Sequence, residues 1–197
     1  MTHTPTDDIT APAMAPVART RPLAESPVLA AKAVQFLCET KPNFTLEPEE
    51  AKCVIPYLRW VSYPAGSFLH LEGDDSRTSH VLLLLEGEVS VDVGASGRAD
   101  RVAVSVLGPG VLIGEMAFLD GAPRSASCTA ITTVQAAGMS HAGLELMAKE
   151  QPSVAFKFLA YMARNTIDRL RALSEQLQMY DQLNASLHQE IAQLRMR

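Results

Sequence analysis

The chain has 197 residues, of which 47% are hydrophobic and 20% are charged. This suits one ordinary domain with an appendage and excludes a disordered chain. The net charge of −5 gives no sign of a surface that coats nucleic acid. Apolar runs such as residues 81–85 are far shorter than the roughly 20 residues that span a bilayer. Three scattered cysteines (Cys38, Cys53 and Cys128) form neither a disulfide framework nor a metal motif, which predicts a reducing, cytoplasmic location.

The N-terminal segment has the composition of a disordered leader. Residues 1–28 hold five of the twelve prolines and few large apolar side chains, and they lack the apolar segment of a signal peptide. Residues 29–59 then predict two short helices. The first is rich in alanine and ends before Pro42, and the second begins among the acidic residues Glu47, Glu49 and Glu50.

Residues 60–150 carry the pattern of a small β-domain. Short apolar runs at 67–71, 80–85, 88–93, 102–107, 126–133 and 134–139 alternate with turns rich in glycine and proline. This spacing predicts an antiparallel, jelly-roll-like β-roll flanked by helices, an α+β fold. Residues 114–119 are the exception, because they mix helix and strand formers and could form one or two helical turns.

The last segment, residues 151–197, predicts one long helix. From residue 153 onward there is neither glycine nor proline in 45 residues. Apolar residues follow the alternating three- and four-residue spacing of a coiled-coil seam, in which Asn184 takes an a position. A single Asn at a favours a parallel two-stranded register, and Glu190 would face Arg195 of a second copy, so we predict a parallel homodimer. The seam consists of Ala163, Thr166, Leu170, Leu173, Leu177, Tyr180, Asn184, Leu187, Ile191 and Leu194.

One stretch inside the β-domain has the chemistry of an anion site. Gly114 precedes a short helix whose first N–H groups would point at an anion. Arg124, nine residues past Glu115, can place two N–H donors on a phosphate, and Ser125 adds a hydroxyl. A carboxylate such as Glu115 beside a phosphate needs a neutral donor, and a ribose hydroxyl is the natural one.

These residues resemble the phosphate-binding cassette of the cyclic nucleotide-binding domain. Bacterial catabolite activator-type regulators, protein kinase regulatory subunits and gated channels share this domain. The resemblance spans roughly residues 45–175 and rests on Gly114-Glu115-x-Ala117-Phe118 followed by Pro123-Arg124-Ser125-Ala126. It implies a non-enzymatic receptor for cyclic AMP or cyclic GMP, without a cofactor or metal. Glu115 would bind the ribose 2′-hydroxyl and Arg124 the phosphate, together with Ser125 and the backbone amides of Glu115, Met116 and Ala117.

The resemblance also bears on recognition of the base. In activator-type relatives the dimer helix caps the purine, and counting along that helix leads here to Arg169 and Leu170. Arg169 could donate to the paired acceptors of guanine, stack on adenine, or be a solvated charge outside the seam. Leu170 could pack on the purine or fill the seam.

Three other functions are open at this stage. One is a dimeric scaffold of the same fold that binds no nucleotide. Another is a receptor for cyclic di-GMP, although a phosphate site built on the single residue Arg124 is small for a dinucleotide. His70, Glu72 and His80 suggest a metal-binding barrel, but the sequence lacks the His-x-His motif of such sites. We expect no DNA binding, because the chain stops at Arg197 without a helix-turn-helix, and residues 150–197 carry six basic and five acidic side chains. The output would then pass to a separate, unknown protein partner.

Overall fold

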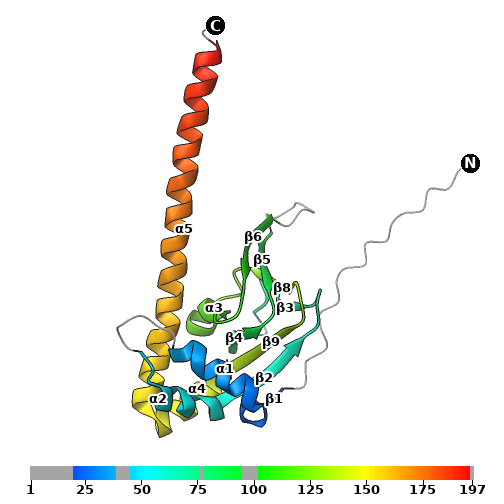
Figure 1. The fold of residues 1–197 in the computed structure, drawn as a ribbon, viewed down its shortest axis with the longest axis vertical. Coiled ribbons are helices and arrows are strands. Elements are labelled where there is room, and N and C mark those ends of the chain that lie inside the picture. The colour runs from blue at the N-terminus through cyan, green and yellow to red at the C-terminus, as the bar shows by residue number, and fades with distance from the viewer. Residues whose placement is uncertain (1–19, 39–44, 76–77, 95–101, 196–197) are drawn as a thin grey trace, which may run out of the picture.

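The computed structural model describes residues 20–38, 45–75, 78–94 and 102–195. They form two antiparallel β-sheets with helices before and after them, and α5, a helix of 44 residues, extends far beyond the sheets (Figure 1). The predicted class, an antiparallel β-roll flanked by short helices and followed by a long C-terminal helix, is confirmed. No helix of the described ranges has both the length and the apolar composition needed to cross a membrane.

The two sheets pack face to face. The five-stranded sheet has the order β1-β2-β9-β4-β7, and the four-stranded sheet has the order β3-β8-β5-β6. The strand pairs of the described chain are all antiparallel. The bounds are β1 Arg21–Pro22, β2 Leu58–Tyr63, β3 Phe68–His70, β4 His80–Glu86, β5 Val89–Val93, β6 Val102–Leu107, β7 Leu112–Ile113, β8 Ser127–Ala130 and β9 Val134–Ser140.

Strand β4 shows why the sequence contains a continuous apolar run. Its side chains alternate between two cores, because successive residues of a strand face opposite sides of the sheet. Val81, Leu83 and Leu85 pack against the helices, whereas Leu82 and Leu84 pack between the two sheets. All five are buried, and each large aliphatic side chain contributes about 1.5–3 kcal/mol. A strand covered on both faces therefore carries no polar alternation.

The helices cover the outer face of the five-stranded sheet. In α1, Leu29, Ala33 and Leu37 recur every four residues and are buried, as expected of an amphipathic helix. The helical bounds are η1 Leu23–Glu25, α1 Pro27–Cys38, α2 Pro48–Val54, η2 Ile55–Tyr57, α3 Glu115–Asp120, α4 His141–Glu150 and α5 Pro152–Arg195.

The predicted leader is wrong at its C-terminal end. Arg21 and Pro22 form β1, which pairs with β2, and Leu23 is fully buried in the core. Helix α1 also begins before residue 29, at Pro27. Amino-acid composition could not predict the order of residues 21–27, because the main apolar contact of this proline-rich segment is one buried side chain, Leu23. Residues 1–19 lie outside the described part of the chain.

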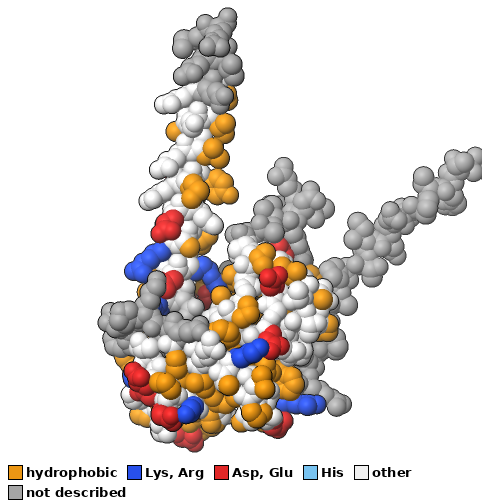
Figure 2. Space-filling model, in the orientation of Figure 1, with side chains coloured by type: hydrophobic (Ala, Val, Ile, Leu, Met, Phe, Trp, Pro, Cys, Tyr) orange, Lys and Arg blue, Asp and Glu red, His pale blue; other side chains and the backbone are white. Residues whose placement is uncertain are grey.

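Helix α5 has two different parts. Its first turns bury five side chains against the roll: Val154, Ala155, Phe158, Tyr161 and Met162. From residue 163 onward, in what we call distal α5 (residues 163–195), none of the described side chains is buried. Large apolar side chains nevertheless line one side of distal α5 (Figure 2): Ile167, Leu170, Leu173, Leu177, Tyr180, Leu183, Leu187 and Ile191. The side chains of Glu190, Leu194 and Arg195, which the predicted seam also uses, lie outside the described residues.

Candidate functional site

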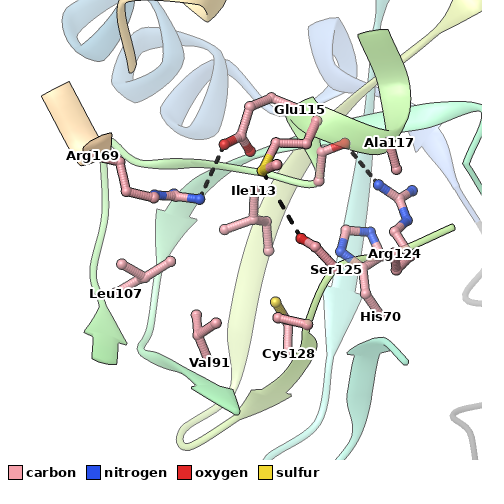
Figure 3. A pocket seen from close by; sticks show the side chains of 13 residues that line it. His70, Val91, Leu107, Ile113, Glu115, Ala117, Arg124, Ser125, Cys128 and Arg169 are labelled. Atoms are coloured by element: carbon pink, nitrogen blue, oxygen red, sulfur yellow. Dashed lines mark hydrogen bonds and ion pairs between the residues drawn. The ribbon is translucent and has the colours of Figure 1, made fainter. Parts of the chain in front are cut away.

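A pocket lies between the four-stranded sheet, the start of α3 and the adjacent part of α5 (Figure 3). The structure gathers eight of the nine predicted site residues around it: Gly114, Glu115, Met116, Ala117, Arg124, Ser125, Ala126 and Arg169. The ninth, Leu170, does not line the pocket and is 63% exposed on α5, among the residues of the predicted seam. Sequence reasoning missed five further lining residues: His70, Val91, Leu107, Ile113 and Cys128.

Gly114 shapes the upper edge of the pocket. Its φ of 80° lies in the left-handed region that favours glycine. A Cβ at this position would come within 2.3 Å of Arg124 Nη1 and 2.6 Å of His70 Cε1. The first intrahelical bond of α3 runs from the Phe118 N–H to the Gly114 carbonyl, so the N–H groups of residues 115–117 precede it. Glycine is therefore required both by the turn into α3 and by the close approach of two side chains.

Arg124 is held deep in the wall of the pocket and is 3% exposed. Its Nη1 donates to the Gly114 carbonyl at 2.7 Å, and its Nη2 donates to the His80 carbonyl at 2.9 Å. The Arg124 backbone is tied to the turn after β3, through Gly73 and Asp74. Burial lowers the pKa of Arg124 from its ordinary value, which the negative charges of Asp74 and Glu115 oppose. An arginine nevertheless keeps its charge in a protein, so a fixed positive charge lies in this wall.

Glu115 faces the pocket from the first turn of α3 and is 1% exposed. Arg169 reaches it from α5, with Nη1 3.0 Å from Glu115 Oε1. The second terminal nitrogen of Arg169 donates to the Leu112 carbonyl at 2.9 Å. The interpretation of Arg169 as a solvated charge is therefore wrong, because it bridges α5 and the predicted cassette. Spacing could not show this, since the two partners are 54 residues apart.

His70 and Cys128 form the floor of the pocket from the paired strands β3 and β8. Both are buried, and burial raises the pKa of the Cys128 thiol to about 11. Cys128 is therefore a protonated thiol and packs as a small buried hydrophobe. Burial, together with the charges of Arg124 and His80, holds the pKa of His70 well below its ordinary value of 6.5. All three residues of β3 are buried, so this strand does not alternate between buried and exposed positions. Its sequence therefore gave no signal that His70 faces the pocket.

The remaining polar groups complete the site. Ser125 is exposed at the mouth, with its Oγ 3.9 Å from Met116 Sδ. Among pocket-lining residues that carry a fixed charge, two guanidinium groups and one carboxylate leave one net positive charge. In the described ranges, no group of three or more His, Cys, Asp and Glu side chains could hold a metal ion. The arrangement thus suits an organic anion with one negative charge and a neutral hydroxyl group.

Comparisons with known proteins agree with this geometry. The sequence profile of the cyclic nucleotide-binding domain matches residues 60–151. The chain is 26% identical over 132 residues to the CRP-like cAMP-activated global transcriptional regulator of Mycobacterium tuberculosis, covering 67% of this chain and 56% of that protein. It is 30% identical over 119 residues to the cyclic AMP receptor protein of Thermus thermophilus, covering 60% and 54%. The chain therefore spans about half the length of these curated relatives.

A solved structure has a similar fold. It is a cyclic nucleotide-binding domain from Methylobacillus flagellatus, with a TM-score of 0.67 and 27% sequence identity, and the match covers 73% of this chain and 79% of that one. Residues 60–151 therefore match the cyclic nucleotide-binding domain family in sequence profile and in fold.

Proposed function

We propose that this chain is a non-enzymatic receptor that binds one cyclic mononucleotide, with cyclic AMP as the first candidate, in the pocket at the start of α3. The observation that carries the proposal is the convergence of the buried side chains of Glu115 and Arg124 and the start of α3 on one pocket with one net positive charge. A cyclic phosphodiester carries one negative charge, and its ribose offers a neutral hydroxyl to a carboxylate. Both named relatives are cyclic AMP-dependent proteins by name, which supports the same ligand here.

Each group has a separate role in this proposal. Nη1 and Nη2 of Arg124 already donate to the Gly114 and His80 carbonyls, so Arg124 contributes its fixed positive charge and its remaining N–H groups to the phosphate. The N–H groups of residues 115–117 also bind the phosphate, and Ser125 adds its hydroxyl from the mouth. Glu115 accepts a hydrogen bond from the ribose, and because Arg169 already occupies its Oε1, the second carboxylate oxygen serves the ribose.

Base selectivity does not come from Arg169 in this proposal. Its two terminal nitrogens are engaged by Glu115 and by the Leu112 carbonyl, so they are not positioned to read a guanine. The Arg169→Thr substitution should therefore leave the ratio of the cyclic AMP and cyclic GMP dissociation constants unchanged, while weakening both.

Calorimetric titration of the full chain with cyclic AMP, cyclic GMP and cyclic di-GMP tests the proposal. We expect saturable binding of a mononucleotide at one per chain and none of the dinucleotide, since a single guanidinium faces the phosphate site. Binding of cyclic di-GMP alone would replace the proposal with a dinucleotide receptor. Absence of binding for all three would favour the nucleotide-independent scaffold.

We also propose that distal α5 joins two copies of the chain in a parallel homodimer. Eight of the nine exposed large apolar side chains in the described part of distal α5 line one side of the helix, and they support the dimer because a second copy would cover them. They include the a and d residues Leu170, Leu173, Leu177 and Tyr180, and Asn184 would fix the register.

The remaining expectations describe the setting of the receptor. All three cysteines are free, which supports a reducing cytoplasmic compartment. We propose that the dimer reports its ligand state to a separate protein, and the expectation that the chain does not bind DNA stays a prediction.

A further inference from the structure

His70 is a buried polar group that the cassette roles above leave unexplained. Its side chain comes from β3 into the floor of the pocket, and the residue is 5% exposed. Its Nε2 atom has no hydrogen-bond partner among the described residues. Buried side-chain nitrogens in folded proteins are normally hydrogen-bonded, because leaving one without a partner costs free energy. An orphaned Nε2 in the lining of a ligand pocket points to a partner that arrives with the ligand.

The imidazole of His70 lies beside the position where the phosphate of a ligand is expected. The edge of its ring at Cε1 and the Nη1 atom of Arg124 both approach Gly114, close enough that a single Cβ there would collide with both. Figure 3 shows the His70 ring between Ser125 and Arg124, below the start of α3. The neutral ring and the guanidinium therefore converge on the anion-binding end of the pocket.

The groups that act most strongly on the His70 ring are positively charged or can become so. Arg124 is the nearest fixed positive charge, and the His80 ring on β4 lies 5.5 Å away between centroids. Desolvation and these two groups disfavour the imidazolium, so His70 is neutral near pH 7. The other titratable or charged side chains that face this pocket are Glu115 on α3, Cys128 on β8 and Arg169 on α5.

We infer that His70 is a further ligand-binding residue, whose Nε2 hydrogen-bonds to the phosphate of the bound nucleotide, and that nucleotide binding brings one proton from solvent onto its imidazole. The inference rests on the proposed function. The added negative charge offsets the positive charge of Arg124, so the imidazolium becomes favourable only in the complex. A phosphodiester does not itself titrate near neutral pH, which leaves His70 as the group that takes up the proton.

Proton uptake by His70 on nucleotide binding sets the direction of the pH dependence. The pKa of His70 is higher in the complex than in the free protein, so the complex binds more protons. Affinity for the nucleotide therefore rises as the pH falls from about 8 to about 6, the range in which histidine commonly titrates. Calorimetry in two buffers of different ionisation enthalpy counts the protons directly.

Three variants of the full chain separate His70 from its neighbours. His70→Leu removes both nitrogens and should weaken cyclic AMP binding by roughly tenfold or more, the worth of a hydrogen bond to a charged group. His70→Gln keeps an amide N–H near the Nε2 position, so it should retain most of the affinity and lose the pH dependence and the proton uptake. His80→Gln is the matched control and should keep nucleotide binding and proton uptake, with the pH dependence displaced toward higher pH, because one group that disfavours the His70 imidazolium is removed. Circular dichroism and thermal melting verify that each variant is folded.

The outcomes distinguish this inference from the function on which it rests. If the wild-type chain binds no cyclic nucleotide at any pH, both are overturned. If it binds, but His70→Leu and His70→Gln show the same affinity and pH profile as the wild type, the role of His70 is overturned and the proposed function stands. If His80→Gln abolishes proton uptake while His70→Gln keeps it, the proton belongs to His80 and the inference is overturned as well.

Discussion

The predicted phosphate cassette and distal α5 differ in which side chains they bury. In the cassette, polar and charged side chains are buried within a single chain: Glu115 is 1% exposed and Arg124 3% exposed, and each contacts defined partners. In distal α5, apolar side chains such as Leu177 and Tyr180 are more than 60% exposed. Buried charge with partners indicates a preformed site, whereas exposed apolar side chains at coiled-coil spacing indicate one half of an interface. Under the proposed function, one chain supplies the whole binding site, whereas two chains are needed to cover distal α5.

Introducing a charge into distal α5 should have the largest effect. Leu177→Asp places a carboxylate at an a position, where burial in a dimer without a partner costs on the order of several kcal/mol. We expect the wild-type chain to sediment as a dimer at micromolar concentration and the variant as a monomer. Gln178→Asp adds the same charge one residue away, outside the seam, and should remain dimeric. A monomeric wild-type chain would show that the exposed apolar residues do not make this interface.

Removing the charge of the cassette should have the next largest effect. Arg124→Ala should weaken cyclic AMP binding by roughly 2–5 kcal/mol, because the phosphate loses its charge-assisted donors. It should also destabilise the fold, since the part-buried hydrogen bonds to the Gly114 and His80 carbonyls are lost.

Arg171, which is exposed on α5, supplies the control for this substitution. Arg171→Ala should change neither affinity nor melting temperature appreciably. Unchanged cyclic AMP affinity in a folded Arg124→Ala protein would remove Arg124 from the site.

The turn into α3 can be tested with two glycines of similar conformation. Gly114 and Gly121 have φ values of 80° and 70°, but a Cβ at Gly121 would meet nothing within 4 Å. Alanine at Gly121 should therefore cost only the left-handed backbone strain, about 1–2 kcal/mol. Alanine at Gly114 should cost about 1–3 kcal/mol more through overpacking and should also weaken nucleotide binding. Equal losses of stability in denaturant titrations would mean that the crowding at Gly114 relaxes without cost.

The smallest effect concerns the ion pair that joins α2 to α5. Lys157 on α5 donates to both carboxylate oxygens of Glu50 on α2 at 2.6 Å, and these hydrogen bonds lower the pKa of Glu50. A lowered pKa in the folded state means that the contribution is present above the unfolded pKa of about 4.3 and is lost as the pH falls through the folded value. Glu50→Gln should lower stability by about 0.2–1 kcal/mol at neutral pH.

The pH profile distinguishes this ion pair from a general effect of charge. The loss caused by Glu50→Gln should shrink as the pH falls through the lowered pKa of Glu50, because the wild-type carboxylate then becomes protonated as well. Glu49→Gln, on the exposed pair with Lys52, is the control and should have a smaller effect at neutral and at low pH. A loss that persists at low pH would show that Glu50 acts through packing rather than charge.

The sequence predicted local features well and long-range contacts poorly. The cassette was visible because its groups lie within thirteen residues, from Gly114 to Ala126, and six of the strands were visible from turn residues and apolar runs. Strands β1, β2 and β7 were missed: β1 and β7 have only two residues each, and β2 begins at Leu58, inside the range predicted as helices. The Glu115–Arg169 ion pair and the entry of His70 into the pocket depend on how distant elements pack, which no local pattern encodes. Leu23 shows the same limit, because one buried side chain orders a segment whose composition predicts disorder.

Equilibrium dialysis of cyclic AMP against the full chain, with linear 5′-AMP as competitor, tests the binding site most directly. The linear nucleotide has the same base and ribose but a phosphate of higher charge and different shape. We predict that the protein retains one cyclic AMP per chain and that an excess of 5′-AMP does not displace it. No retention of cyclic AMP, or displacement by 5′-AMP at comparable concentration, would contradict the assignment of the pocket to a cyclic phosphodiester.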